Sequence, residues 1–182
     1  MSMMGSLLLD KIVQKNNLDT SNILIELNKE IIRVLDQTSG GEIQDGMDIA
    51  ICIVNKKDRI VHFSGARNGI IAISDSKIKR FDADLYSVGG SYTNKSKKIN
   101  RQFKSQQIEL RKGDWVFMYS DGFYDQLGES SHRSLGMSKF ETILATCATN
   151  TAGQHNILLE EFNSWKGSLP QIDDLLVLGF RI

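Results

Sequence analysis

Three carboxylates that flank apolar segments are the residues whose types and spacing could do chemistry. Asp121 follows the apolar run Trp115–Tyr119, and Asp173 and Asp174 precede the apolar run Leu175–Phe180. If these runs are neighbouring antiparallel strands, one strand ends and the other begins with Asp, so the carboxylates come close together. Like charges at that separation repel and stay ionised only with a cation between them. Hard oxygen ligands select Mg2+ or Mn2+ over zinc.

The same residues have a purely structural interpretation. Asp121-Gly122 is typical of a turn, and Asp173-Asp174 is typical of a strand cap. On spacing alone this interpretation is the more common one, because neither dipeptide is rare in loops. A further acidic segment, Asp45 to Asp48, precedes another apolar run and could approach the same edge.

Other classes of chemistry find no support in the sequence. The chain contains no P-loop, GxGxxG, GxSxG or HExxH pattern. Its histidines, His62, His132 and His155, are too scattered to pair as ligands by spacing. With 22 Lys+Arg against 22 Asp+Glu, the formal net charge is zero. The basic footprint of a dedicated nucleic-acid binder is missing, so we expect no nucleic-acid partner.

Length and composition predict one globular domain over residues 1–182. Hydrophobic residues make up 41% and charged residues 24% of the 182 positions, which suffices for a buried core. No apolar run approaches the roughly 18 to 20 residues of a membrane span, so we expect no membrane contact. Cys52 and Cys147 lack metal-site spacing and read as reduced thiols. The first residues do not resemble a signal peptide, so we expect a cytoplasmic location.

Apolar residues at three- and four-residue spacing predict four helices. The second begins at the N-cap types Asp19-Thr20-Ser21, and the third at a capping box formed by Ser138 and Glu141. The four predicted helices run from Met3 to Val13, fading at Asn16-Asn17; from Asp19 to Ser39-Gly40-Gly41; from Ser138 to Cys147; and from Gln154 to Trp165, with a stop at Gly167.

Period-two patterns and short apolar runs predict the strands. The run Ile49 to Val54 is apolar on both faces and is predicted to be a central strand. An antiparallel meander is predicted after it, over Ile60 to Ser64, Gly69 to Ser74 and Lys77 to Phe81. Phe103–Leu110 and Trp115–Tyr119 are predicted to form a hairpin, and Leu175–Phe180 the last strand. This order of elements predicts an α+β fold.

Six blocks, in this order, resemble those of a SpoIIE-like serine/threonine phosphatase domain. That family belongs to the metal-dependent protein phosphatases, the type 2C superfamily, and the resemblance covers the chain from Met1 to Ile182. The blocks are Asp45–Ala50, Ser64–Asn68, Val88–Gly90, Ser120–Gln126, Trp165–Gly167 and Gln171–Val177.

The resemblance implies an α-β-β-α sandwich of antiparallel sheets flanked by helices, with two Mn2+ or Mg2+ ions. Water activated by these ions would attack a phosphoserine or phosphothreonine in line. By the resemblance, Asp121 matches the metal-binding Asp of the Ser-Asp-Gly block and Asp173 the first Asp of the final block, with Asp174 as the alternate. Leu176 stands where the family usually has Thr, which removes a hydroxyl near the site but no ligand.

Three further residues are candidates for contact with the metal ligands or the substrate. Gly122 belongs to the Ser-Asp-Gly block. Asp48 could lie behind the metal ligands or cap a strand. Arg67 could hold a substrate phosphate, but an Arg on a turn is more often a solvated tip.

The blocks that carry the family's first two metal aspartates are absent from this sequence. We therefore expect a sandwich incomplete at its N-terminus, equivalent to the C-terminal two-thirds of the family domain, and weak or no activity for the chain alone. Exposed sheet edges would favour a homodimer or low solubility. The alternatives are a catalytically dead pseudophosphatase that acts as a partner-binding or dimerisation module, and a plain core domain.

The family also suggests partners. By analogy the substrate is a signalling phosphoprotein, such as an anti-sigma antagonist in a partner-switching cascade, and an upstream sensor domain would precede the phosphatase in the parent protein.

Overall fold

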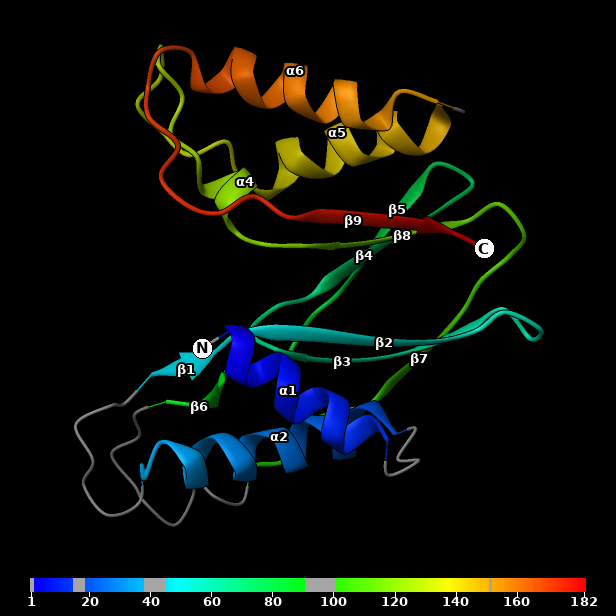
Figure 1. The fold of residues 1–182 in the computed structure, drawn as a ribbon. Helices are drawn as coiled ribbons and strands as arrows, with labels where there is room; N and C mark the ends of the chain where they lie inside the picture. The colour runs from blue at the N-terminus through cyan, green and yellow to red at the C-terminus, as the bar shows by residue number, and fades with distance from the viewer. Residues whose placement is uncertain (1, 15–18, 38–44, 91–100, 151) are drawn as a thin grey trace. The chain divides into compact units, whose positions relative to one another are not determined.

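The computed structural model of the chain describes residues 2–14, 19–37, 45–90, 101–150 and 152–182 (Figure 1). These residues form two units. The first unit comprises Met1–Gly69 and Asp82–Leu110, and the second comprises Ile70–Phe81 and Arg111–Ile182. The α+β class predicted from the sequence is confirmed, because both units combine helices with antiparallel strands.

The first unit contains two helices, a three-stranded sheet and a small two-stranded sheet. Strand order in the larger sheet is β2-β3-β7, and β1 pairs with β6. The elements are α1 (Ser2–Val13), α2 (Thr20–Val34), β1 (Gly46–Met47), β2 (Ile49–Asn55), β3 (Ile60–Ala66), β6 (Val88–Gly89) and β7 (Gln106–Glu109).

Helix α2 begins where the sequence predicts. Asp19 has an extended backbone, and its Oδ1 accepts a hydrogen bond from the amide of Ser21 at 2.9 Å, which makes Asp19 the N-cap. The predicted ends of the first two helices, at 16–17 and 39–41, lie outside the described residues. The helix buries an apolar stripe in the first unit's core, formed by Ile23, Leu24, Leu27 and Ile31.

A buried polar residue ties α2 to β6. Asn28 is fully buried, and its Oδ1 accepts a hydrogen bond from the amide of Gly89 at 2.9 Å. Gly89 has a φ of +68°, and a Cβ there would lie 2.6 Å from Ile31 Cγ2. A glycine is required because the backbone approaches the helix closely in a conformation that other residues rarely adopt.

The prediction that Ile49–Val54 is a central strand is wrong. Among the described strands, β2 pairs only with β3, and β3 lies in the middle of the sheet. The residues of β2 up to Val54 are half-buried. Apolar residues on both faces indicate that both faces of a strand are covered. They do not indicate whether the strand pairs with one neighbour or two, so an edge strand can have the same pattern as a central one.

The second unit contains a four-stranded antiparallel sheet in the order β5-β4-β8-β9 and three helices. Helices α5 and α6 lie side by side next to this sheet (Figure 1). The elements are β4 (Ile70–Ser74), β5 (Lys77–Phe81), β8 (Trp115–Tyr119), α4 (Gly122–Asp125), α5 (Met137–Thr149), α6 (Gln154–Lys166) and β9 (Val177–Arg181).

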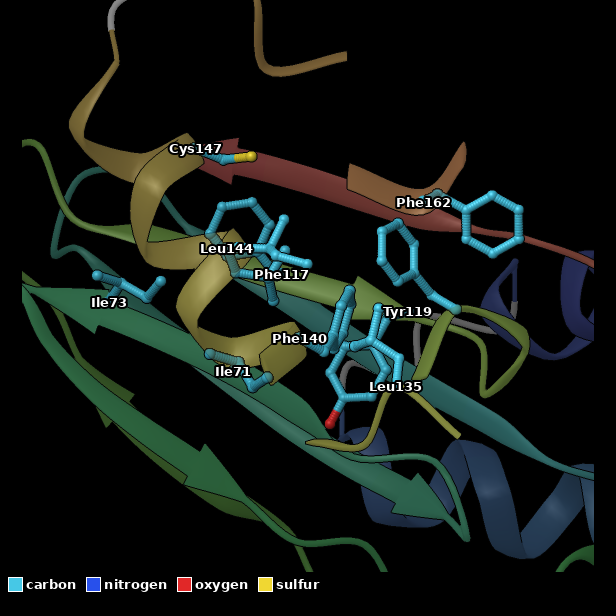
Figure 2. Close-up of a cluster of buried hydrophobic side chains, with 11 residues drawn as sticks. Ile71, Ile73, Phe117, Tyr119, Leu135, Phe140, Leu144, Cys147 and Phe162 are labelled. Carbon is cyan, nitrogen blue, oxygen red and sulfur yellow. The ribbon is translucent and has the colours of Figure 1, made fainter. Parts of the chain in front are cut away.

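A cluster of aromatic and aliphatic side chains forms the core of the second unit (Figure 2). The Tyr119 and Phe140 rings meet edge to face with centroids 5.2 Å apart, and the Phe123 and Phe162 rings do the same at the same distance. Such pairs add to the free energy gained by burying the rings. The first pair joins the end of β8 to α5 and the second joins α4 to α6, so ring contacts lie on both sides of Asp121 in the sequence.

The predicted hairpin over Phe103–Leu110 and Trp115–Tyr119 is also wrong. Strand β7 pairs with β3, whereas β8 pairs with β4 and β9. The predicted meander is likewise divided, because β3 and β4 belong to different sheets. A local turn such as residues 111–114 allows a hairpin, but long-range packing decides which strands pair.

The capping box predicted at Ser138 does not form. Helix α5 begins at Met137, with Gly136 at the N-cap and no side-chain cap. Ser138 therefore lies inside the first turn, where its carbonyl accepts a hydrogen bond from the hydroxyl of Thr142. The predicted stop of α6 is confirmed, because Gly167 is its C-cap with a φ of +58°.

None of the helices in the described ranges is long and apolar enough to cross a membrane.

Candidate active site

Asp121 lies at the end of β8, as the sequence predicts. Strand β8 ends at Tyr119, and Asp121 then precedes the short helix α4 with its backbone already helical. Its side chain makes no capping hydrogen bond to that helix. The carboxylate is therefore not committed to the usual structural role of an Asp at a helix start.

Asp173 and Asp174 lie just before β9, which is the antiparallel neighbour of β8. The register pairs Tyr119 with Val177, so β8 ends where β9 begins. This is the juxtaposition that the sequence predicts for the two acidic segments. Asp173 Oδ1 accepts a hydrogen bond from the Asp174 amide at 2.7 Å, which holds its carboxylate against its own backbone.

Ser120 joins the two acidic segments. Its hydroxyl donates to the carbonyl of Asp174 at 2.8 Å and accepts from the amide of Leu176 at 2.9 Å. The backbone amide of Ser120 also donates to the carbonyl of Leu176 at 2.9 Å. These three hydrogen bonds extend the pairing of β8 with β9 past the ends of the strands.

Gly122 lets the two segments approach closely. A Cβ at this position would lie 2.5 Å from the carbonyl oxygen of Asp174 and 3.2 Å from the carbonyl carbon of Asp173. Neither group is the end of a flexible side chain, so any larger residue would push the segments apart. The red segment that leads into β9 passes beside α4 in Figure 1.

The charges of the two segments act on the same neighbour. The pKa of Asp125 is raised above its ordinary value, first by loss of hydration and then by the negative charges of Asp121 and Asp173. Two separate stretches of sequence therefore concentrate negative potential at the end of α4. A bound cation would relieve this repulsion.

The described residues gather too few donors to complete a metal site. Among them, no three His, Cys, Asp or Glu side chains gather closely enough to hold an ion by themselves. The donor chemistry of Asp121 and Asp173 fits Mg2+ or Mn2+, which prefer carboxylate oxygens. The number of donors does not complete a coordination shell, so these two residues fit the ion as a partial ligand set.

Asp48 and Arg67 contact each other in the first unit. Arg67 Nε lies 3.4 Å from Asp48 Oδ2, and the hydroxyl of Ser87 donates a hydrogen bond to Asp48 Oδ1. The side chain of Arg67 is 60% exposed, and its φ is +58°. Arg67 directly follows β3 and forms an isolated bridge with Ile49, and its guanidinium has Asp48 as a partner.

Sequence reasoning missed two residues of this region. Asp125 follows Asp121 by one helical turn, and this spacing of two acidic residues could have indicated it. Gln126 is fully buried at the end of α4. A single Gln carries no sequence signal for burial, since most Gln side chains are exposed.

A cavity of about 240 Å3 lies elsewhere in the second unit. Its lining includes Trp115 and Arg181, the first residue of β8 and the last of β9. Asp121 and Asp173 flank the opposite ends of the same strands. The cavity is therefore separate from the candidate active site.

A family model covers the whole chain. The model described as Stage II sporulation protein E (SpoIIE) matches residues 1–182. The comparison with curated proteins finds no match.

Solved structures of phosphatase domains share the fold. The SiaA-PP2C domain of Pseudomonas aeruginosa has a TM-score of 0.85 at 20% identity, and the match covers 99% of this chain and 68% of that one. The phosphatase domain of SpoIIE from Bacillus subtilis has a TM-score of 0.57 at 15% identity, covering 98% and 73%. RsbX in complex with magnesium has a TM-score of 0.60 at 14% identity, covering 97% and 72%.

At these identities the solved structures show the fold, and the family model shows the family. The resemblance carried by the ordered sequence blocks is thereby confirmed. The chain belongs to the SpoIIE family, and it shares its fold with PP2C phosphatase domains.

Proposed function

We propose that this chain is part of a metal-dependent protein phosphatase that hydrolyses phosphoserine or phosphothreonine in a signalling phosphoprotein. The observation that carries the proposal is the antiparallel pairing of β8 with β9, which brings the segments of Asp121 and Asp173 together. Membership of the SpoIIE family supports the reaction class.

Asp121 and Asp173 are the proposed ligands of Mn2+ or Mg2+, with Asp174 as the alternate. When bound, such ions would lower the pKa of water and neutralise charge on the phosphoryl oxygens. The chain's contribution is to hold the carboxylates in place. Ser120 links the two segments through hydrogen bonds, and Gly122 leaves room for their close contact.

The first unit supplies a candidate for substrate contact. Arg67 is paired with Asp48 at 3.4 Å, but both side chains are substantially exposed. Exposed ion pairs are weak, whereas a phosphate accepts two parallel hydrogen bonds from one guanidinium. We propose that Asp48 orients the guanidinium of Arg67, and that a substrate phosphate takes the place of the Asp48 carboxylate on that guanidinium.

The remaining ligands of the two-ion site would come from outside this sequence. The blocks with the family's first two metal aspartates are absent from residues 1–182. We therefore propose that the chain corresponds to the C-terminal two-thirds of the family domain and has weak or no activity by itself. A phosphoprotein substrate such as an anti-sigma antagonist, and a sensor domain in the parent protein, are proposed by family analogy.

A second candidate function is that of a pseudophosphatase that binds a partner. It is favoured by one observation: no group of three metal-binding side chains gathers among the described residues. A domain that kept the fold and lost part of its ligand set would bind phosphoproteins or another copy without hydrolysis.

Release of phosphate from a synthetic phosphoserine peptide tests the first function. We expect slow turnover that requires Mn2+ and stops with a chelator. Asp121→Asn should lower it at least about tenfold, the usual scale for damage to a metal site. The matched control is Asp75→Asn, because Asp75 is an exposed carboxylate whose Oδ2 pairs with Arg111 at 2.8 Å.

Three outcomes of this assay are informative. Mn2+-dependent turnover that is lost in Asp121→Asn and kept in Asp75→Asn supports the phosphatase. Equal turnover in Asp121→Asn would contradict the ligand role of Asp121. No turnover by the folded wild-type chain agrees with a partial ligand set and with the pseudophosphatase, and the same assay on the parent protein would then decide between them.

A further inference from the structure

Gln126 is a buried polar residue at the junction of the two acidic segments. It follows α4 directly, its backbone leaves the helical conformation there, and its exposed fraction is 0%. Burying an amide costs free energy unless its donors and acceptor are hydrogen-bonded. The partners of Gln126 therefore show what its burial achieves.

The side chain of Gln126 holds the loop that leads to Asp173. Its Nε2 donates to the carbonyl of Pro170 at 3.1 Å, and its Oε1 accepts from the amide of Ile172 at 3.2 Å. Nε2 also donates to the carbonyl of Leu127 at 3.1 Å. All donors and the acceptor of this amide are thus used.

The backbone carbonyl of Gln126 fixes the residue from the other side. It accepts from the amide of Leu135 at 3.0 Å and from the indole Nε1 of Trp165 at 2.9 Å. Trp165 lies near the end of α6. Gln126 is therefore anchored to the helical layer while its side chain reaches the Asp173 loop.

The chemistry of this junction requires an amide. The loop presents a carbonyl at Pro170 and an N–H at Ile172, so it needs a donor and an acceptor on one side chain. Glu lacks the donor when ionised, and Leu or Met lacks both groups. Asn has the same groups on a chain that is shorter by one methylene.

Gln126 and Ser120 bracket the two proposed ligands. Ser120 contacts the segment at Asp174 and Leu176, and Gln126 contacts it before Asp173. The two acidic segments are thus joined on both sides of the carboxylates.

We propose that Gln126 is a positioning residue. It fixes the segment that carries Asp173 against helix α4, which directly follows Asp121. That Gln126 strengthens metal binding rests on the proposed function. That it holds the loop at Pro170 and Ile172 does not. The prediction is that the separation of the two carboxylates is set by the protein before any ion binds. A site fixed in advance loses less freedom when it binds its ion.

Two measurements on Gln126→Leu test this. The first is amide hydrogen exchange by NMR in the metal-free chain. We expect the Ile172 amide to exchange at least about tenfold faster, because its acceptor is gone, and the Leu176 amide, bonded to Ser120, to stay protected. The second is Mn2+ calorimetry, where we expect at least about a tenfold loss of affinity.

Two controls separate positioning from general loss of stability. Gln154→Leu makes the same substitution at a half-buried Gln, the first residue of α6, whose Nε2 donates to the carbonyl of Asn150 at 2.8 Å. Leu144→Ala weakens the same core without touching the acidic segments. Neither should change exchange of the Ile172 amide or Mn2+ affinity while the chain remains folded.

The outcomes separate this proposal from the proposed function. Unchanged Ile172 exchange in Gln126→Leu, or the same acceleration in Leu144→Ala, would overturn the positioning role. A wild-type chain that binds no Mn2+ would overturn the metal site, and exchange of the Ile172 amide would then decide the role of Gln126 alone. If Gln126→Leu does not fold, Gln126→Asn replaces it, and wild-type exchange and affinity in that variant would overturn the proposal.

Discussion

The hydroxyl of Ser120 donates a hydrogen bond of 2.8 Å to the carbonyl of Asp174. This bond joins the residue before one proposed ligand to the residue after the other, across the two strands β8 and β9. The hydroxyl also accepts from the amide of Leu176, so both of its hydrogen-bonding roles are used. One side chain thus fixes the relative position of two segments that are far apart in the sequence.

Ser120→Ala removes both side-chain hydrogen bonds and leaves the backbone bond to Leu176. We expect a loss of about 1 kcal/mol in the free energy of unfolding and weaker Mn2+ binding, because the Asp174 carbonyl is released. Urea denaturation and calorimetry measure the two effects. Ser130→Ala, in an exposed turn, is the control. Wild-type Mn2+ affinity in Ser120→Ala would show that this link does not position the ligands.

Gly122→Ala places a methyl group 2.5 Å from the carbonyl oxygen of Asp174. We expect a cost of about 1 to 3 kcal/mol from overpacking, together with loss of Mn2+ binding, because the clash displaces the Asp173–Asp174 segment. The contrasting control is Gly153→Ala, where φ is +83° and no atom lies within 4 Å.

The control should lose stability through backbone strain alone and keep its Mn2+ affinity. If both variants lose Mn2+ affinity equally, the contact between Gly122 and Asp174 has no special role.

Asn28→Ala leaves the amide of Gly89 buried without its side-chain acceptor. We expect the free energy of unfolding to fall by about 1 to 3 kcal/mol, the cost of an unsatisfied buried donor. Exchange of the Gly89 amide should also accelerate. Asn22→Ala is the matched control, because Asn22 bonds to Asp19 in an exposed position. A stability change as small as that of the control would mean that the bond contributes little.

Burial raises the pKa of the Cys52 thiol to about 12 from an ordinary value of 9.0. Its thiolate is therefore absent at pH 8, and alkylation of the folded chain by iodoacetamide should be slow until denaturant is added. Between the ordinary and the raised pKa, the Cys52 thiol keeps its proton in the folded state and loses it in the unfolded state. Stability should therefore fall as the pH rises from about 9 to about 12.

The control for this pH dependence is Cys52→Ala, which should show a smaller loss of thermal stability over the same range. A wild-type slope no steeper than that of the variant would contradict the effect of burial.

The sequence predicts the ends of the strands better than their partners. Strand β8 ends at Tyr119 as predicted, and β9 begins at Val177, two residues after the predicted Leu175, so the local pattern placed both acidic segments at strand ends. The partner of a strand depends on packing between distant segments. This is why β2 was expected in the centre of a sheet and β7 beside β8.

For the candidate site, too, the sequence could name some residues in advance and not others. Asp121 and Asp173 could be named in advance because a carboxylate at a strand end, in an ordered series of family blocks, is a recognisable pattern. Gln126 and Ser120 could not, since their roles depend on hydrogen bonds to residues 46 and 54 positions away. Only the folded chain brings these groups together.

The most direct test of the central claim is an NMR titration of the chain with Mn2+, whose unpaired electrons broaden nearby amide signals. The account predicts that, at the lowest Mn2+ ratios, broadening is strongest at Asp121, Gly122, Asp173 and Asp174, and that it is lost in Asp121→Asn but not in Asp75→Asn. Broadening at other residues only, or broadening that persists unchanged in Asp121→Asn, would contradict the assignment of these carboxylates as metal ligands.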